Sequence, residues 1–379
     1  MGSLFVTCLP GLETVLAKEV EALGFATRPW KGGVFVDGAT LRDAMVLNLH
    51  LRTASRVLWH LFDISNPTKS RLYKAISDVD WRVWFTDFPT LAIDVPFAQH
   101  PDYSNSLYVA QLAKDAICDQ LRAATGKRPS VDVKNPQIQF SIIVDPRKAS
   151  LSFDTSLQPL FKRGYREDGG IAPLKETLAA ALLSLAGYEA HQGHILFDPC
   201  CGTGTILIEA ALMATKTPPG LLRTSFGFVR HPEFQEEEWR QVRAEGIARV
   251  QPSPGRIIFG CEQDPKTYHL LLRAIAKAGM MDVIETWQKD FRDCHLKKAP
   301  NFVITNPPFG VRMGEMRRWI PLYSAIGHFM KRYTQKPSVG AVLSSSPELI
   351  KAIGLAPKQK IKLSHGGLEA LFCVYDIYG

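Results

Sequence analysis

Residues 195–205 read Ile-Leu-Phe-Asp-Pro-Cys-Cys-Gly-Thr-Gly-Thr, and this stretch decides the fold of the second half of the chain. Its apolar start predicts a buried strand, its glycines predict a tight turn, and a helical pattern follows over residues 205–214. The same alternation continues: we expect strands at 256–260, 283–287, 302–305, 339–343, 361–363 and 371–377, and helices at 174–186, 267–278, 321–333 and 347–353. This order predicts an α/β unit with a mostly parallel seven-stranded sheet, helices on both faces and an antiparallel hairpin at one edge.

The turn after the first strand has the features of a cofactor site. Gly202 and Gly204 let the backbone approach a ligand without a Cβ atom in the way. The pattern is not a dinucleotide-binding loop, because Leu207 stands where a third glycine would fall and Asp198 precedes the turn. A carboxylate here suits a cationic cofactor with an amino-acid part better than a pyrophosphate. Cys201 is expected to pack inside the turn. By itself the loop also fits a plain strand-to-helix turn.

Acidic residues follow the next two strands. Glu262 comes just after the strand at 256–260, where its carboxylate can accept hydrogen bonds from both hydroxyls of a ribose. Asp264 is either a second ligand or only the cap of the following helix. After the third strand, Asp290 can accept a hydrogen bond from an adenine amino group, and Phe291 can line the ring. Because ligands of open parallel sheets bind at the carboxyl ends of the strands, these side chains are expected to meet.

The four residues Asn306-Pro307-Pro308-Phe309 follow the fourth strand and carry the strongest chemical signal in the sequence. Two successive prolines remove two N–H donors and leave outward-pointing carbonyls in a stiff turn. An exocyclic amine that attacks a sulfonium methyl group needs acceptors for its two hydrogens, and the Asn306 amide oxygen and Pro307 carbonyl fit that role. Phe309 offers a face on which the base can stack. A rigid turn alone would explain the prolines but not their neighbours, so the motif predicts methyl transfer to a nucleobase amino group.

The N-terminal part predicts two smaller α+β units. Residues 1–42 read as a strand, a helix and two short strands. Residues 43–154 contain the rest of a helical stretch at 41–62, then a strand at 91–95, a helix at 106–124, and paired strands at 139–144 and 149–154. Residues 155–170 are polar, basic and glycine-bearing, which favours a linker to the unit at 171–379.

The composition predicts a soluble, cytoplasmic protein with a polyanionic partner. No run of about 18 apolar residues and no secretory start are present, so neither a membrane partner nor export is expected. The 7 cysteines are scattered without a C-x-x-C pair, and they predict neither a disulfide framework nor a metal site. The net charge of +8 favours a polyanion, and its excess lies in residues 155–379.

Together, these motifs carry a family resemblance. The combination of Asp198-Pro199-x-Cys201-Gly202-x-Gly204-Thr205 with Asn306–Phe309 resembles class I, Rossmann-like methyltransferases that modify amino groups. Residues 162–166 (Lys-Arg-Gly-Tyr-Arg) and 171–180 (Ile-Ala-Pro-Leu-Lys-Glu-Thr-Leu-Ala-Ala) resemble the entry segment of RNA guanine-N2 methyltransferases that carry a THUMP domain. Residues 1–42 and 43–154 look like the ferredoxin-like and THUMP units of that family. The opening of the chain, Ser3-Leu4-Phe5 with Gly11-Leu12-Glu13, is most similar to the N-terminal half of bacterial 23S rRNA guanine-N2 methyltransferases.

The resemblance implies S-adenosylmethionine as cofactor and RNA as substrate, most of all 23S rRNA. It implies that the methionine part is held by Asp198, Cys201, Gly202, Gly204 and Thr177, the ribose by Glu262, the adenine by Asp290 and Phe291, and the guanine by Asn306, Pro307, Pro308 and Phe309. The THUMP unit would dock RNA by shape and backbone contacts. Further candidates for RNA contact are Lys162, Arg163, Arg166 and Arg312.

The sequence departs from this family in two ways and leaves other functions open. Phe309 stands where the family often has tyrosine, which keeps stacking but loses a hydroxyl. The sequence ends without the second methyltransferase module of some fused relatives, so one modification is expected. Transfer RNA is the neighbouring substrate, and the Asn-Pro-Pro-aromatic motif alone also fits adenine-N6 methylation of DNA. A non-catalytic RNA-binding assembly factor would keep the fold without needing intact cofactor acids.

Overall fold

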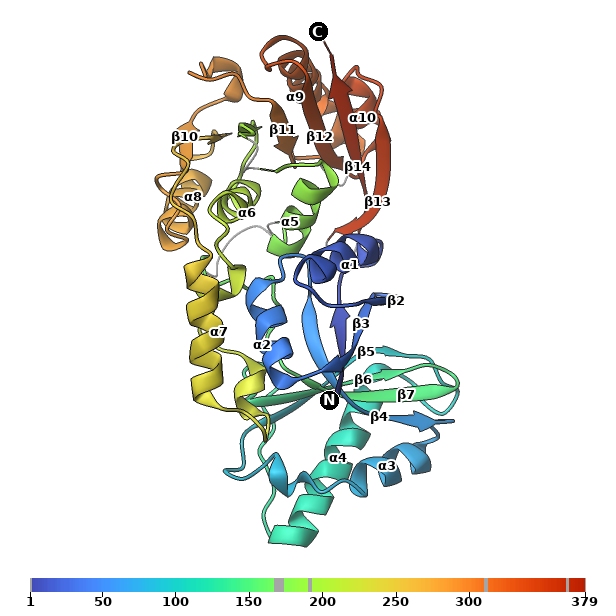
Figure 1. The fold of residues 1–379 in the computed structure, drawn as a ribbon. Helices are drawn as coiled ribbons and strands as arrows, with labels where there is room; N and C mark the ends of the chain where they lie inside the picture. Colours follow the sequence, from blue (N-terminus) through green and yellow to red (C-terminus); the bar gives the residue numbers. More distant parts are fainter. Residues whose placement is uncertain (1, 167–173, 190–192, 310–312, 366–367, 379) are drawn as a thin grey trace.

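The computed structural model describes residues 2–166, 174–189, 193–309, 313–365 and 368–378. Its described strands form two seven-stranded sheets at opposite ends of an elongated molecule (Figure 1). The C-terminal sheet and its helices fill the upper part of this view. The N-terminal sheet lies below, and α4 extends to the lower tip.

The C-terminal sheet has the predicted open, mostly parallel architecture. Its strands are β8 (Leu196–Asp198), β9 (Ile258–Glu262), β10 (Ile284–Gln288), β11 (Phe302–Thr305), β12 (Ser338–Ser344), β13 (Gln359–His365) and β14 (Leu368–Ile377). Their order is β10-β9-β8-β11-β12-β14-β13, with parallel pairing from β10 to β12 and antiparallel pairing of β14 with both neighbours. The predicted strands and the final hairpin are confirmed.

Helices cover both faces of this sheet. They are α5 (Glu176–Leu185), α6 (Thr205–Ala214), α8 (Pro265–Lys277), α9 (Met313–Arg332) and α10 (Pro347–Ala352), whereas α7 (Glu236–Ala248) packs against α2 (Leu41–His50) of the N-terminal unit (Figure 1). Leu196 belongs to an apolar core with α5, α6 and α8, whereas Phe197 belongs to a second core with α9 and α10. Successive residues of a strand point to opposite faces, so this division shows a sheet buried on both sides. The connection from β10 to β11 contains only the short 3-10 helix η5 (Phe291–Asp293) among its described residues.

The N-terminal sheet joins the two predicted α+β units into one. Its strands are β1 (Gly2–Thr7), β2 (Arg28–Trp30), β3 (Gly33–Ala39), β4 (Arg56–Ser65), β5 (Leu91–Ala98), β6 (Ile138–Val144) and β7 (Lys148–Asp154), in the order β2-β3-β1-β4-β7-β6-β5. All neighbours are antiparallel except β5 and β6. The helices are α1 (Glu13–Ala22), α2 (Leu41–His50), α3 (Lys69–Ser77) and α4 (Ser106–Thr125), with the 3-10 helix η1 (Trp81–Val83).

The predicted helical stretch at 41–62 is wrong in its second half. Helix α2 ends at His50, because Leu51 takes an extended backbone conformation, and β4 starts at Arg56. In β4, Val57 and Trp59 alternate onto one face, where Trp59 pairs with Leu4 on one side and Phe153 on the other. Alternation of β-branched and aromatic residues stabilises a strand once partner strands exist on both sides.

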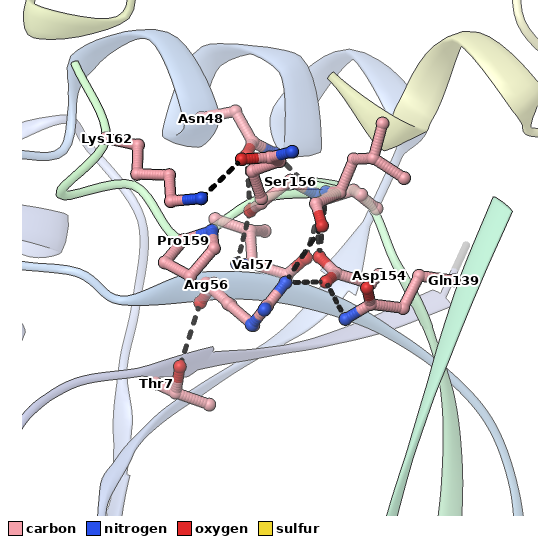
Figure 2. A network of polar contacts seen from close by, with 12 residues as sticks. Thr7, Asn48, Arg56, Val57, Gln139, Asp154, Ser156, Pro159 and Lys162 are labelled. Carbon is pink, nitrogen blue, oxygen red and sulfur yellow. Dashed lines mark hydrogen bonds and ion pairs between the residues drawn. The ribbon is translucent and has the colours of Figure 1, made fainter. Parts of the chain in front are cut away.

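The predicted linker is also a packed segment where the structure describes it, at 155–166. Asp154 is fully buried and accepts hydrogen bonds from Gln139 at 3.1 Å and from Arg56 (Figure 2). The Ser156 hydroxyl donates to the Asn48 amide oxygen at 2.6 Å and accepts from the Val57 N–H at 2.9 Å. These buried, satisfied contacts tie the chain to α2 and β4 as it leaves the N-terminal sheet.

A glycine at the junction gives a test of this packing. Gly227 begins the 3-10 helix Gly227–Arg230, and a Cβ atom there would lie 2.0 Å from the Asp154 carbonyl oxygen. We predict that Gly227→Ala lowers the free energy of unfolding by about 1–3 kcal/mol, because backbone atoms must move to admit the methyl group. The exposed Thr224→Ala in the same segment should change it by less than about 0.5 kcal/mol. Urea denaturation compares the two, and equal stabilities would contradict this packing.

Candidate active site

The carboxyl ends of β8, β9, β10 and β11 bring the predicted site residues to one edge of the sheet. Asp198 ends β8 and Glu262 ends β9, while Asp290 and Asn306 follow β10 and β11. The parallel register aligns Asp198 with Gly260 of β9, and β11 pairs with the other side of β8. Four polar side chains from distant parts of the sequence therefore converge, as expected for a ligand site in an open parallel sheet.

The turn after β8 is tight and needs its glycines. Gly202 and Gly204 have φ values of +54° and +81°, a region that glycine adopts without strain. A Cβ atom at Gly204 would also lie 2.3 Å from the Leu271 side chain. The Cys201 N–H donates to the Cys261 carbonyl at 3.0 Å, and the residue is buried, so Cys201 packs inside the turn. The backbone of this turn therefore lies at the strand ends, where a ligand can approach it closely.

Asp198 is a buried carboxyl group with few compensating contacts. Its side chain is 2% exposed and accepts the Cys200 N–H at 3.1 Å. Burial, with a smaller contribution from the negative charge of Glu262, raises the pKa of Asp198 to about 7. A cation bound beside Asp198 would favour the charged carboxylate, so the residue is poised to bind a positively charged group.

The acids after β9 take different roles. Glu262 is half-buried, and its Oε1 atom accepts the Asp264 N–H at 2.8 Å. Asp264 caps α8 by accepting the Thr267 N–H at 2.8 Å, and hydrogen bonds from Thr267 hold its pKa below the usual value. Of the two roles predicted for Asp264, helix capping is observed. The residue also lines a cavity.

Asp290 already has a strong partner. Its carboxylate accepts hydrogen bonds from the Arg292 side chain at 2.9 Å (Nε) and 2.5 Å (Nη2), and these bonds keep the pKa of Asp290 low. Phe291 is buried and meets Phe329 edge-to-face, with ring centroids 6.2 Å apart. The strand end therefore presents an ionised carboxylate beside an aromatic wall.

Asn306 has an unusual polar atom. Its amide oxygen Oδ1 is buried and has no hydrogen-bond partner among the described residues. An unmet buried acceptor costs about 1–3 kcal/mol, so its retention points to a ligand that donates to it. Pro307 is buried, Pro308 is exposed, and Phe309 is partly buried against the apolar core around α9.

Two cavities meet at Asn306. The first, of about 420 Å³, is lined by Asp198, Cys201 and Thr203 and reaches Thr267 on α8. The second, of about 410 Å³, is lined by Glu262, Asp290, Phe291, Pro308 and Trp319, among others. Three residues, Cys200, Gly202 and Asn306, line both cavities. An elongated ligand with a polar end could span the pair, passing Asn306 at the middle.

The described residues offer neither a metal site nor a membrane span. They contain no cluster of three or more His, Cys, Asp or Glu side chains arranged to hold a metal ion. No helix within these ranges combines the length and apolar character needed to cross a membrane.

Comparisons with known proteins decide the family. Residues 163–372 match the model described as "RMKL-like, methyltransferase domain". The chain belongs to this methyltransferase family. Residues 3–58 match the RlmL ferredoxin-like domain and residues 68–154 match the THUMP domain, so the family resemblance and the three-part fold class are confirmed.

Individual relatives of this chain carry methyltransferase or methylase names. The chain is 35% identical over 378 residues to the "Ribosomal RNA large subunit methyltransferase K/L" of Methylococcus capsulatus, covering 98% of this chain and 51% of the relative. It therefore spans about half the length of the curated relatives it matches. A putative methyltransferase complexed with SAH is 25% identical, with a TM-score of 0.86 and coverage of 100% and 98%. A predicted N6-adenine-specific DNA methylase from Listeria monocytogenes is also 25% identical, with a TM-score of 0.86 and coverage of 99% and 96%.

The predicted RNA-contact residues of the methyltransferase do not form one surface. Lys162 is exposed and bonds Gln158, whereas Arg312 lies outside the described residues. The prediction for Arg163 is wrong: its side chain is 1% exposed, pairs with Glu209 at 3.4 Å, and donates to the Arg52 and Leu160 carbonyls. A guanidinium with these partners holds the N-terminal unit against α6 and cannot reach RNA.

Arg166 contacts the start of α6, which lines the first cavity, and Thr177 lies on α5. Arg166 donates to the Thr205 hydroxyl at the start of α6 and pairs with Glu176 at 3.4 Å. Arg166 therefore supports the turn after β8, contrary to a purely RNA-facing role. The Thr177 hydroxyl is buried without a partner among the described residues. Burial raises the pKa of Glu176 to about 7, even beside Arg166.

Sequence reasoning missed several lining residues. Lys266 and Thr267 reach the first cavity because α8 starts at its rim, and Trp319 and Leu322 reach the second from α9. Their distance from the strand ends hid them, although Trp319 follows the Asn-Pro-Pro-Phe motif closely enough for an aromatic helix face to have suggested it.

Asp198→Asn should make the stability of the ligand-free fold less dependent on pH. The raised pKa means that the folded protein keeps a proton that the unfolded chain loses, so wild-type stability falls as the pH rises from about 4 to about 7. The variant lacks this loss. We predict a higher Tm than wild type at pH 8, by a few degrees, with a smaller difference at pH 5.

Thermal unfolding of the ligand-free protein at both pH values measures this effect. Asp264→Asn serves as the control, because that exposed carboxylate has a lowered pKa and its replacement should not raise the Tm. A variant at Asp198 that is no more stable than wild type at pH 8 would contradict the burial argument.

Arg163→Ala should destabilise the fold, because it leaves Glu209 buried without its cation. We expect a loss of about 3–5 kcal/mol in the free energy of unfolding. Lys162→Ala, at the exposed neighbouring position, should stay within about 0.5 kcal/mol of wild type. Urea denaturation distinguishes them, and a stable Arg163→Ala protein would restore a surface role for this arginine.

Proposed function

We propose that the chain transfers a methyl group from S-adenosylmethionine to the exocyclic N2 of a guanine in large-subunit ribosomal RNA. The observation that carries this proposal is the buried, unpaired Oδ1 acceptor of Asn306 at the junction of two cavities. The methyltransferase family membership supports the reaction class. The names of the relatives and the presence of a THUMP domain support ribosomal RNA as the substrate.

The residues present fit the proposed cofactor. Asp198 suits its ammonium group, and the unpaired Thr177 hydroxyl lies on the helix that leads into this end. Glu262 suits the ribose hydroxyls, while Asp290 and Phe291 suit the adenine. S-adenosylmethionine, when bound, supplies an electrophilic methyl group on a cationic sulfur. A relative of this fold complexed with SAH is consistent with this assignment.

The reaction needs orientation more than a strong base. Asn306 Oδ1 and the Pro307 carbonyl accept the two amino hydrogens of the guanine, which directs the nitrogen lone pair toward the methyl carbon. The proline pair holds these acceptors rigidly, because it fixes two backbone φ angles. The amino nitrogen becomes acidic only once the new bond forms, and it then releases its proton to solvent.

The base must leave its stack to reach Asn306. Phe309 and Trp319 are aromatic side chains on which it can stack. Phe309 is the last residue of the Asn306–Phe309 motif, and Trp319 lines the second cavity. The choice of guanine N2 follows from the resemblance of residues 162–166 and 171–180. The domain assignment, with a ferredoxin-like unit at 1–42, THUMP at 43–154 and the methyltransferase at 171–379, remains part of the same proposal.

A labelling experiment tests the substrate. The purified chain is incubated with isotopically labelled S-adenosylmethionine and, separately, undermethylated large-subunit ribosomal RNA, transfer RNA and DNA. We expect label in N2-methylguanosine from ribosomal RNA. Label in transfer RNA alone would show that transfer RNA is the substrate in place of ribosomal RNA. Label in DNA adenine alone would agree with the name of the Listeria relative. No label in any pool would favour a non-catalytic binding factor.

Asn306→Ala tests the reaction centre. We expect kcat to fall by at least about 10²-fold, because an acceptor that orients the nucleophile is lost. The Kd for S-adenosylhomocysteine, measured by calorimetry, should remain within about threefold of wild type. Phe309→Tyr keeps the stacking ring and serves as the control, with kcat close to wild type. Full activity in Asn306→Ala would refute the assigned role.

A further inference from the structure

A third cavity of about 920 Å³ borders the second cavity and extends along α9 away from the proposed reaction centre. It runs between the β10–β11 connection, from Phe291 to Ala299, and the second half of α9, from Pro321 to Arg332. Its volume falls within the range of about 300–1,000 Å³ that is usual for ligand sites. It extends beyond the two cavities assigned to the proposed cofactor and the target guanine.

The topology explains why this space is open. A parallel sheet is normally covered by a crossover helix after each strand. Between β10 and β11 the described chain forms only η5, so no crossover helix fills the space between this connection and α9. Phe291 and Leu296 in the connection and Phe329 in α9 leave an apolar floor between them.

The walls of the cavity are basic and aromatic. Arg332, His295 and His328 are exposed and line it, and the Tyr333 ring, 60% exposed, lies at its edge. The Tyr333 ring packs against His328 and Phe329 at centroid distances of 6.0 and 5.6 Å, and these contacts fix the orientation of the ring. No carboxylate belongs to the lining residues that the structure describes. Exposed aromatics beside cations are the chemistry that binds single-stranded nucleic acid.

The cavity continues from the reaction centre. Phe291, Arg292 and Pro321 line both this cavity and the second cavity, the one that reaches Asn306 and Pro308. Arg332 lies at the far end of α9, about 16 Å along the helix from Pro321, so a strand that places one base at Asn306 would reach Arg332 and Tyr333 only after about two or three further nucleotides. Lys297 and Lys298, both exposed in the same connection, add positive charge near this path, and the exposed Asp293 of that connection offsets one of these charges.

We propose that this cavity is a subsite for an RNA nucleotide about two or three positions from the methylated guanine, with Tyr333 stacking on its base and Arg332 binding its phosphate. The inference rests on the proposed RNA methyltransferase function. A protein partner on this face is the competing occupant, and the positive charge and the absence of lining carboxylates among the described residues favour RNA.

Kinetics on naked, undermethylated ribosomal RNA test the subsite. Tyr333→Ala and Arg332→Ala should each raise KM for RNA by about five- to tenfold, while kcat and the Kd for S-adenosylhomocysteine stay near wild type. Tyr333→Phe keeps the ring and should restore the wild-type KM. Lys360→Ala removes an exposed cation from β13, at the opposite edge of the sheet, and should change nothing.

Crosslinking gives an independent readout. RNA carrying 4-thiouridine about two or three positions from the target guanine should crosslink to the segment that contains Tyr333 in wild type, and lose that crosslink in Tyr333→Ala. Unchanged KM and crosslinking in the variants would overturn the subsite. A defect seen only with protein-containing ribosomal particles would also overturn it, in favour of a protein partner. Failure of wild type to methylate any RNA would instead sink the proposed function.

Discussion

The site depends on the parallel pairing of β8 between β9 and β11. This pairing sets Asp198 beside Gly260, two residues before Glu262, while β11 on the other side leads into the Asn306 turn, although the three segments are far apart in sequence. Each strand is short, with 3 residues in β8 and 4 in β11, so its position depends on burial of both faces. Leu196 and Phe197 serve the two cores in turn, and the apolar core around α5 and α6 also includes residues of α1 and α2. The N-terminal unit thereby helps to hold the strand ends in register.

Several buried polar groups at and near the strand ends lower the stability of the ligand-free fold and are available to bind a ligand. Asp198 sits in a place where its own charge is disfavoured, and Asn306 and Thr177 keep buried oxygens without partners among the described residues. Asp154 (Figure 2) and Arg163 each have several hydrogen-bond partners, but other buried polar atoms away from the strand ends, such as Ser77 Oγ and Gln120 Oε1, also lack one within the described ranges. What distinguishes Asn306 is that its unpaired oxygen belongs to a residue that lines two cavities, where a ligand can complete its hydrogen bonding.

Sequence patterns found the residues whose position follows from local order. A strand end fixes where the next residue lies, so the convergence of Asp198, Glu262, Asp290 and Asn306 could be predicted from the sequence alone. The C-terminal strands were predictable for the same reason, since each has an apolar run bounded by a turn. The capping role of Asp264 was foreseen as an alternative, because an acid before a helix is typical of a cap.

What could not be predicted depends on contacts between distant segments. Strand β4 forms only because β1 and β7 flank it, and its Leu- and Val-rich sequence also fits a helix. Arg163 reads as a surface cation until Glu209 and the Arg52 carbonyl are seen around it. The cavity beside α9 comes from the short β10–β11 connection, where η5 takes the place of a crossover helix. No single residue in the sequence predicts this cavity.

A crystal structure of the chain with S-adenosylhomocysteine would show most directly whether the strand ends form the cofactor site. We predict a ligand that spans both cavities, with its amino-acid end at Asp198, its ribose at Glu262, and its sulfur on the side that faces Asn306. A ligand bound away from these strand ends, or an Asn306 amide turned away from the sulfur, would contradict this assignment.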